Sequence, residues 1–476
     1  MTPMRKILFL FALAGLVSCG PQPALKDVQF SGVLENPQDG SVELNFFRDF
    51  INNDRKVVAL ELDEANAFFT HFEVKEAVMG TLTTGRGSLP IFLEPGTPLH
   101  LEGDARQLSQ LVFSGAGSAE NNFLMDYRNR AESTISRSLI NEKARDLGPD
   151  EYLLFADSIA AVKWNFFEDH VKNHALSPAL TVFFQTQVLY EKFQQLLDYP
   201  SLHQRLNQMD ALPVLPDHYY GFLDQATQFD GDRLNNLTYV NFLLAYLGHQ
   251  RLVDEVDFPD GTSGHVANYH LAARYLTGRT KYYIQALAVS REMNSGDLDL
   301  AMELFDEYME ISPVEAYKQS LQDELAKIQV LWAGNPAPDF TMTDIHGNQV
   351  SMRDYLGKVV YLKFWASWCG PCMREVPPAA ELKQRMKGEE DLVFMYVSID
   401  TDPVAWKNQV ERHGITGVHT RTPGRERGVP AMYHVRWIPT FYIIGRDGNI
   451  YDHRPLRPSD GELLDEALRA ALGADV

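Results

Sequence analysis

The chain has 476 residues, more than a single domain usually holds, so roughly two to four domains are expected. Hydrophobic residues make up 45% and charged residues 22% of the chain, as in ordinary globular proteins. The formal net charge of -21 argues against a nucleic-acid-binding protein, because such proteins need a basic surface for phosphate groups.

The first residues are expected to direct the chain out of the cytoplasm. Residues 1–18 place basic side chains before an apolar run and a small residue, the pattern of a signal peptide too short to span a bilayer comfortably. Residues 16–19, Leu-Val-Ser-Cys, resemble a bacterial lipobox, in which the cysteine, here Cys19, is acylated and becomes the new N-terminus. This predicts a lipid-anchored protein of an oxidising, extracytoplasmic compartment. Position 20 is not aspartate, which favours the outer membrane. The alternative is an ordinary signal peptide with a chance cysteine.

Residues 19–117 are expected to form a β-sandwich-like N-terminal domain. Short segments alternate apolar and polar residues, and turn residues such as those at 37–40 separate them. The turn at 94–96 and the segment 113–122 resemble parts of a domain of unknown function that precedes many secreted thioredoxin-like lipoproteins. No nucleophile is paired with a base here, so a docking or spacing role is expected.

Residues 118–331 are expected to form an all-α region, either a bundle of helical hairpins or a short solenoid without a recognisable repeat. Aromatic residues at helical spacing are expected in its core. Proline and glycine residues separate the helices, and the sequence Asp198-Tyr199-Pro200 is expected to end one of them. The helices are predicted at 121–137, 151–171, 179–197, 234–247, 265–276, 298–309 and from Ser312 to about 330.

Residues 332–338, WAGNPAP, are expected to be a linker, because prolines and small residues stop the preceding helix. The pattern that follows, over residues 334–476, is typical of an α/β domain. Residues 359–366 form a nearly continuous apolar run, as expected for a central strand that is buried on both faces. Asp402 and Pro403 begin a helix, and residues 459–462 read as a capping box for the final helix. The segment 418–431 is interpreted as a surface loop.

Two cysteines follow the apolar strand at the point where a helix begins. Cys369 and Cys372 are separated by two residues, and a helix N-terminus favours a thiolate over a thiol. A zinc site would need about four ligands, and no second pair of cysteines or histidines accompanies this one. We therefore expect a redox pair without metal or other cofactor.

The surrounding residues resemble the active site of the thioredoxin superfamily. The run from Phe364 to Cys372 reads FWASWCGPC, and Glu375 and Pro377 extend it to Cys-x-x-Cys-x-x-Glu-x-Pro. This longer form is similar to the TlpA/ResA-like family of extracytoplasmic thiol–disulfide oxidoreductases. The resemblance covers about residues 334–476 and implies a thioredoxin-like fold there.

The resemblance also implies roles for individual residues. Cys369 would be the nucleophile that forms a mixed disulfide with the substrate, and Cys372 the resolving thiol, so the pair forms a disulfide when oxidised. The intervening dipeptide is that of thioredoxin, a reductant, and it favours a reductase. Pro439 matches the cis-proline of the superfamily, beside which a substrate strand pairs. The residues expected to contact substrate are Trp368, Gly370, Pro371, Ile438, Pro439 and Thr440.

Two charged residues are expected beneath the cysteines. In family members a glutamate at the position of Glu375 is buried and assists proton transfer, although a glutamate in a first helical turn can simply stabilise the helix N-terminus. Lys363 departs from the family pattern, since thioredoxin has a buried aspartate at this position and the TlpA/ResA-like family often has asparagine. Its side chain either reaches solvent or lies near Cys372, and our hypothesis is that it pairs with Glu375 and stabilises the thiolate.

These features together predict a membrane-anchored, extracytoplasmic disulfide reductase. Its expected partners are disulfide-containing proteins, a thiol electron donor of the envelope and the membrane, but not nucleic acid. Cytochrome c maturation, repair of oxidised cysteines and folding of envelope proteins remain open as its purpose. The alternatives are a disulfide oxidase or isomerase on the same fold, or an envelope-binding module with an accessory redox domain.

Overall fold

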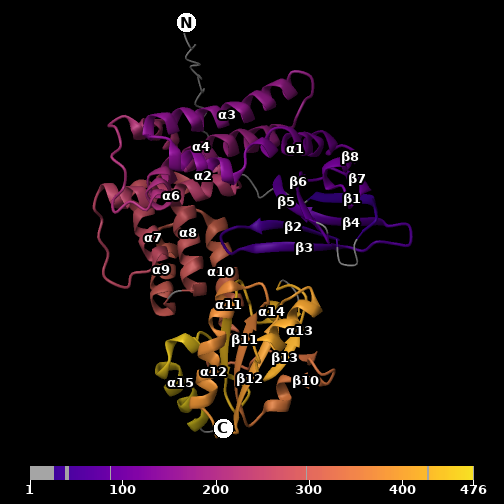
Figure 1. The fold of residues 1–476 in the computed structure, drawn as a ribbon, viewed down its shortest axis with the longest axis vertical. Coiled ribbons are helices and arrows are strands. Elements are labelled where there is room, and N and C mark those ends of the chain that lie inside the picture. The colour runs from indigo at the N-terminus through magenta and orange to yellow at the C-terminus, as the bar shows by residue number, and fades with distance from the viewer. Residues whose placement is uncertain (1–25, 38–41, 86, 296, 426–427, 475–476) are drawn as a thin grey trace. The chain divides into compact units, whose positions relative to one another are not determined.

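The computed structural model describes residues 26–474 apart from 38–41, 86, 296 and 426–427. The predicted signal peptide and Cys19 lie outside the described residues. The described residues fall into two compact units: one includes residues between 26 and 48, 58–134 and 166–181, and the other includes 49–57, 135–165 and the described residues from 182 onward. The colours of Figure 1 follow the residue number and locate these segments along the chain. Of the helices described, none is both long and apolar enough to cross a membrane.

The N-terminal region is a β-sandwich of two four-stranded sheets, in the orders β4-β1-β7-β8 and β3-β2-β5-β6. The strands alternate buried and more exposed residues, and side chains from both sheets, among them Phe30, Leu44, Leu82 and Leu101, share one core. The predicted β-rich region is confirmed. Among the strand pairs of the sandwich whose register is described, β1 and β7 run parallel and the others antiparallel. The strands are β1 (Lys26–Glu35), β2 (Val42–Asp49), β3 (Asp54–Leu60), β4 (Ala67–Val74), β5 (Val78–Thr84), β6 (Gly87–Leu93), β7 (Leu99–Asp104) and β8 (Val112–Ser114).

Two asparagines attach the first helix, α1 (Ser118–Arg130), to this sandwich. The side-chain amide of Asn121 accepts from the backbone N–H of Phe92 at 2.8 Å and donates to its carbonyl at 2.9 Å. Asn122 makes the same pair of bonds with Phe113, at 2.9 and 2.8 Å. Each amide thus takes the place of a neighbouring strand, which satisfies backbone groups that would otherwise be buried without partners.

The middle of the chain is helical, as predicted, but α2 and α8 were not expected. In α8 the residues from Tyr283 to Ser290 are buried without interruption. This part of the helix has no exposed face, so its apolar residues do not recur at the three- and four-residue spacing by which the other helices are predicted. Aromatic side chains such as Tyr190, Tyr239 and Phe242 fill the core, as predicted. The helices are α2 (Arg137–Asp146), α3 (Pro149–Val171), α4 (Pro178–Asn207), α5 (Leu223–Ala226), α6 (Leu237–Val253), α7 (Gly264–Tyr275), α8 (Gly278–Ser295), α9 (Leu298–Ile311) and α10 (Glu315–Gln329).

The prediction that a helix ends at Asp198-Tyr199-Pro200 is wrong, because α4 continues through Pro200 to Asn207. A proline inside a helix cannot donate to the carbonyl four residues earlier, which here belongs to Leu196. The hydroxyl of Tyr219, itself fully buried, donates to that carbonyl at 3.0 Å. A contact from another segment therefore replaces the hydrogen bond that Pro200 removes.

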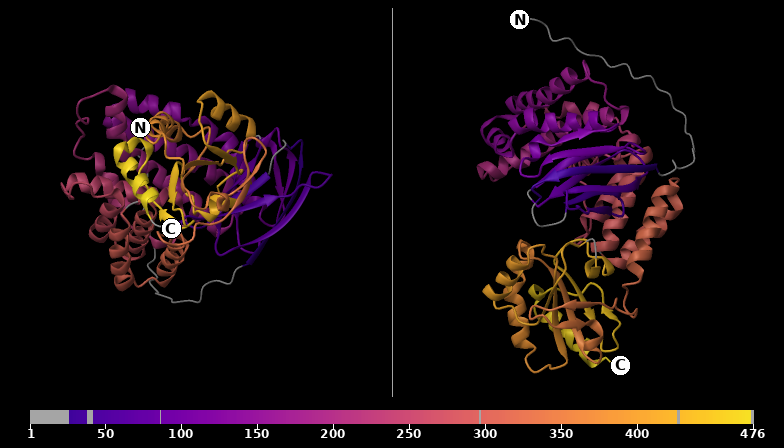
Figure 2. Two further views of the ribbon diagram at one scale, coloured as in Figure 1. Left: turned by 90° about the horizontal axis from the view of Figure 1, so that it is seen from below. Right: turned by 90° about the vertical axis from the view of Figure 1, so that its right-hand side faces the viewer.

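The C-terminal region is an α/β domain, as predicted (Figure 2). It contains a five-stranded sheet of order β13-β12-β11-β14-β15. The central strand β11 pairs in parallel with β12 and antiparallel with β14, and each of its residues is buried. The strands are β9 (Thr341–Thr343), β10 (Gln349–Ser351), β11 (Val359–Trp365), β12 (Leu392–Ser398), β13 (Val418–Arg421), β14 (Thr440–Ile444) and β15 (Ile450–Asp452). The helices are α11 (Gly370–Arg374), α12 (Val376–Arg385), α13 (Pro403–Arg412), α14 (Gly428–Met432) and α15 (Glu462–Gly473).

Two local predictions in this domain are wrong. The segment 418–431 is not a surface loop throughout, because its first four residues form β13, in which His419 and Thr420 are buried against β12. The strand is too short to show an alternating pattern. Ser459 does not cap the final helix, which begins after Gly461 without a side-chain cap. The cap of α13 by Asp402 is confirmed, since its side chain accepts from two backbone N–H groups.

The segment 332–338 is bonded to the α/β domain along its length. The N–H of Gly334 donates to the carbonyl of Ile450 at 2.8 Å, and Ile450 donates to the carbonyl of Asn335 at 2.8 Å. Leu331, just before the segment, packs in the hydrophobic core beside β11. The end of α10 is therefore held directly against the sheet domain.

We predict that Tyr219→Phe destabilises the helical region by about 1–3 kcal/mol, since it leaves the Leu196 carbonyl buried without a donor. The loss should be smaller in a Pro200→Ala background, where residue 200 regains an N–H that can bond that carbonyl. Urea unfolding followed by far-UV circular dichroism measures the four variants of this cycle. Equal losses in both backgrounds would contradict the replacement described above.

Candidate active site

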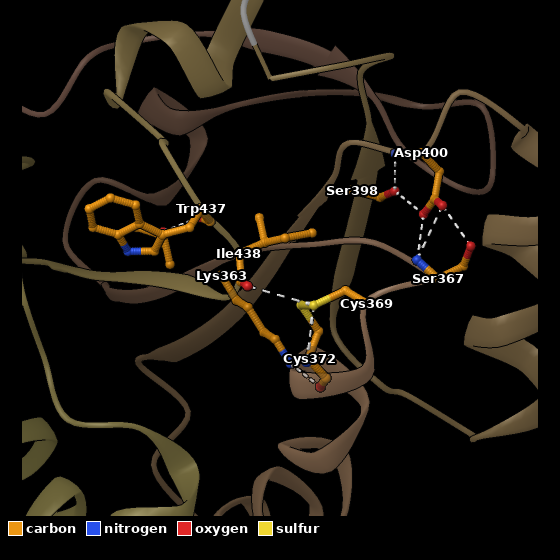
Figure 3. The surroundings of a disulfide bond; sticks show 9 residues. Lys363, Ser367, Cys369, Cys372, Ser398, Asp400, Trp437 and Ile438 are labelled. Carbon is orange, nitrogen blue, oxygen red and sulfur yellow. Dashed lines mark hydrogen bonds between the residues drawn. A yellow bond between two sulfur atoms is a disulfide. The ribbon is translucent and has the colours of Figure 1, made fainter. Parts of the chain in front are cut away.

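The two cysteines lie where β11 leads into α11, and their sulfur atoms are joined at 2.03 Å (Figure 3). Cys369 is the residue that precedes the helix, and its sulfur accepts from the backbone N–H of Cys372 at 3.1 Å. This is the disulfide that the resemblance implies. Cys372 is fully buried, whereas Cys369 is slightly exposed and follows Trp368, whose side chain is 68% exposed. An incoming disulfide would therefore reach Cys369 first.

A second loop lies across the disulfide. The peptide bond between Ile438 and Pro439 is cis, and the carbonyl oxygen of Ile438 is 3.7 Å from the sulfur of Cys369. Trp437 presents a partly exposed indole ring beside it, and the hydroxyl of Thr440 donates to the Trp437 carbonyl at 2.6 Å. The loop thus brings three of the predicted contact residues to the cysteines. The other three, Trp368, Gly370 and Pro371, are exposed around Cys369.

Asp400, which the sequence analysis did not single out, fixes the turn that precedes Cys369. Its buried carboxylate accepts from the backbone N–H of Ser367 at 2.9 Å and from its hydroxyl at 2.6 Å (Figure 3). The hydroxyl of Ser398, at the end of β12, donates to the same carboxylate at 2.6 Å. The position of the nucleophile thus depends on a strand that follows it in sequence.

Glu375 is buried at the break between α11 and α12, three residues after Cys372 in the chain. Its carboxylate accepts from the backbone N–H of Ser459 at 3.0 Å and from the Ser459 hydroxyl at 2.9 Å. The serine that resembled a helix cap is therefore the partner of Glu375. This carboxylate is held at a fixed place, which a proton-transfer group requires.

Lys363 is only 3% exposed, so its side chain does not reach solvent. Its ammonium group donates to the carbonyl of Cys372 at 3.3 Å (Figure 3). Burial lowers the pKa of Lys363 to about 8. The negative charge of Glu375 raises this pKa in part, and the positive charge of Lys383 lowers it further. Among the described residues, no ion pair within 4.0 Å joins Lys363 to Glu375. The amine therefore contacts the backbone of the resolving cysteine and senses the glutamate at longer range.

Comparisons with known proteins concern this part of the chain. The Redoxin family model matches residues 332–462. Thiol-disulfide oxidoreductase ResA of Bacillus anthracis is 32% identical over 119 residues, which are 25% of this chain and 67% of the relative. ResA of Bacillus cereus is 31% identical over 129 residues, 27% of this chain and 73% of the relative. The solved thioredoxin domain of a thiol-disulfide oxidoreductase from Bacteroides vulgatus, at 25% identity, covers 30% of this chain and 99% of its own, with a TM-score of 0.27.

We predict that Lys363→Met makes the protein more stable at pH 7 by up to about 3 kcal/mol. The folded pKa near 8 lies below the ordinary value of 10.5, so below pH 8 the fold carries a buried ammonium. Between pH 8 and pH 10.5 the amine of Lys363 is protonated in the unfolded chain but mostly neutral in the folded one, so the stability of the wild type rises with pH in this range. The advantage of the variant should therefore shrink towards pH 10.

Urea unfolding at both pH values tests this, with tryptophan fluorescence as the signal because five of the six tryptophans lie at or after residue 332. The exposed Lys387, in the turn that follows α12, supplies the matched control, Lys387→Met. An advantage that is the same at pH 7 and pH 10 would show that the amine is not the source of the difference.

Proposed function

The chain belongs to the TlpA/ResA-like thiol–disulfide oxidoreductases of the thioredoxin superfamily, and we propose that it reduces disulfide bonds in proteins of the cell envelope. It is an enzyme of thiol–disulfide exchange. The observation that favours reduction over oxidation of the substrate is the dipeptide between its cysteines, Gly370-Pro371, which is also found in the reductant thioredoxin. The exposed residues around Cys369 leave room for a polypeptide substrate.

The proposed reaction begins with the reduced pair. The thiolate of Cys369 attacks one sulfur of the substrate disulfide, the substrate bond breaks, and the leaving sulfur takes up a proton. A mixed disulfide joins Cys369 to the substrate. Cys372 then loses its proton and attacks the sulfur of Cys369, which releases the second substrate thiol and closes the Cys369–Cys372 disulfide. Two electrons pass from enzyme to substrate, so a thiol donor must reduce the enzyme again.

Resolution requires a proton to leave Cys372, which has no access to solvent. We assign Glu375 as the group that exchanges this proton, since it is a buried carboxylate that ends the helix of Cys372 and is held in place by Ser459. Lys363, bonded to the carbonyl of Cys372, would favour the thiolate while its amine is charged. The resolving thiol is thus assigned one acid–base group, Glu375, and one cation, Lys363.

The substrate strand is proposed to pair with the backbone of the loop that carries Ile438, Pro439 and Thr440. Trp368 and Trp437 would pack against it, because exposed indole rings contribute large contact areas at little entropic cost. Extracytoplasmic placement, with a lipid anchor on Cys19 in the outer membrane, is supported by the signal-like residues 1–18 and the lipobox-like residues 16–19. Residues 19–117 and 118–331 would then form a platform between the anchor and the domain 334–476.

We predict a reduction potential for the Cys369–Cys372 pair close to that of thioredoxin, about −270 mV. Equilibration of the chain lacking residues 1–19 with dithiothreitol redox buffers, read by tryptophan fluorescence, measures it. A potential near that of a strong oxidant such as DsbA, about −120 mV, would reverse the proposed direction and make the protein an oxidase.

We predict that Cys372→Ser accumulates a mixed disulfide with its substrates, because Cys369 can still attack but nothing resolves the product. Non-reducing electrophoresis and mass spectrometry of envelope extracts identify the trapped proteins. Cys369→Ser is the matched control and should trap none. Equal trapping by the two variants would contradict the assignment of Cys369 as the nucleophile.

A further inference from the structure

A cavity of about 200 Å³ lies beside the loop that carries the cis-proline. Pro439, Thr440 and Trp437 form part of its lining, and Met293 of α8 and Ile328 of α10 form another part. The helical region therefore builds one wall of a cavity whose other wall touches the active-site loop. Nothing in the proposed reaction so far uses this cavity.

The charged residues that line the cavity are all basic. Three arginines, Arg436, Arg454 and Arg457, lie around it, and the described lining includes no aspartate or glutamate. This clustering contrasts with the net charge of -21 for the whole chain. Arg457 is exposed, and no ion pair of its side chain is found among the described residues. The cavity thus combines apolar walls with guanidinium groups, a composition suited to an anion on a carbon chain.

Two of these arginines have buried carboxylates behind them. Glu324 of α10 is fully buried and pairs with Arg436, and the charge of Glu292 acts on Arg454. These carboxylates lie outside the lining and offset part of the positive charge. Arg457 remains the arginine that an incoming anion would meet first.

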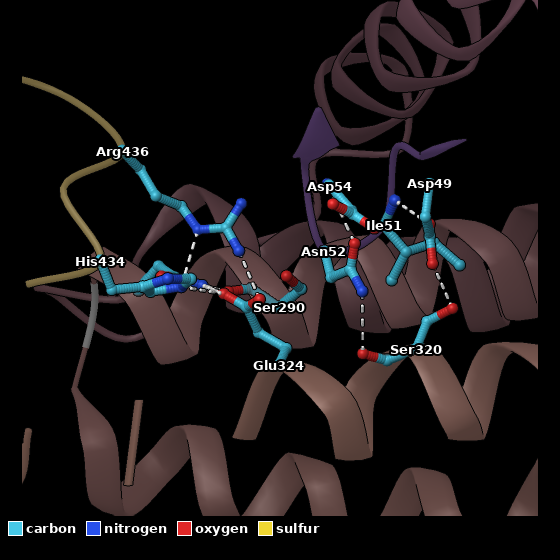
Figure 4. A network of polar contacts seen from close by, with 10 residues as sticks. Asp49, Ile51, Asn52, Asp54, Ser290, Ser320, Glu324, His434 and Arg436 are labelled. Atoms are coloured by element: carbon cyan, nitrogen blue, oxygen red, sulfur yellow. Dashed lines mark hydrogen bonds and ion pairs between the residues drawn. The ribbon is translucent and has the colours of Figure 1, made fainter. Parts of the chain in front are cut away.

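The wall formed by the loop is held against the helices by Glu324. Its carboxylate accepts from Asn294 at 2.6 Å, from His434 at 2.9 Å and from Arg436 (Figure 4). Burial alone would raise the pKa of Glu324, but the hydrogen bond from His434 and the charge of Arg436 bring it below its ordinary value, so the pair stays ionised. Arg436 directly precedes Trp437, so this ion pair positions the loop and the cavity together.

We infer that the cavity binds a carboxylate of the substrate, carried within a few residues of the cysteine that Cys369 attacks. This inference rests on the proposed function. A substrate strand paired with the cis-proline loop places its neighbouring residues about 3.3 Å apart, so the residue after the attacked cysteine, or the next, reaches the cavity. The carboxylate could belong to an acidic side chain of a protein or to a small disulfide such as glutathione disulfide.

The test compares the reduced full-length enzyme on two disulfide-bonded peptides that differ only in a glutamate or a glutamine next to the attacked cysteine. We expect kcat/KM to be about tenfold higher for the glutamate peptide, as for one charge-assisted contact. In Arg454→Met/Arg457→Met the ratio should fall towards one. Arg412→Met, which removes an exposed arginine of α13 that does not line the cavity, should leave the ratio unchanged.

Glutathione disulfide and its ethyl ester form the second arm. A preference for the acid form lost in the double variant would extend the site to small disulfides, and a preference confined to the peptides would assign it to protein substrates. Equal rates on both peptides in the wild type would overturn the inference. If no disulfide is reduced, whatever its charge, the failure lies instead in the proposed reductase function.

Discussion

The burial of β11 on both faces is the constraint on which the site depends. A strand with no exposed residue must end before any reactive side chain can meet solvent. The strand ends at Trp365, the exposed Trp368 lies beyond it, and the cysteines follow. The same burial places Lys363 in apolar surroundings and moves its pKa towards neutrality. The position of the nucleophile and the altered chemistry of the lysine have one cause.

Much of this fold could be predicted from local patterns in the sequence. The apolar run of β11, the Cys-x-x-Cys spacing at a helix start and the Asp402-Pro403 cap each depend on neighbouring residues, so they could be predicted. Ser459 illustrates the limit: its spacing fits a helix cap, yet its hydroxyl donates to Glu375, 84 positions away. Pro200 illustrates the same limit, since a tyrosine from another segment supplies what the proline removes.

The site residues that could not be predicted from the sequence belong to common residue types, and their partners lie far away in the sequence. Asp400 and Glu324 are two acidic residues in an acidic chain, and nothing near them in sequence distinguishes them from solvated ones. Glu324 meets His434 across 110 positions. Burial of a carboxylate is costly unless its partners are in place, so such residues become visible only once the chain is folded.

The attachment of residues 332–338 also bears on how the sheet avoids pairing with other molecules. β15 is the last strand of its sheet, and an edge strand offers unpaired backbone groups to any extended chain. Gly334 and Asn335 occupy such groups of Ile450, so the segment that joins the helices to the sheet also covers this edge. Cutting the chain there would expose both a strand edge and the apolar site of Leu331. The segment 332–338 therefore protects the edge of the sheet from pairing with other chains, in addition to joining the sheet to the helices.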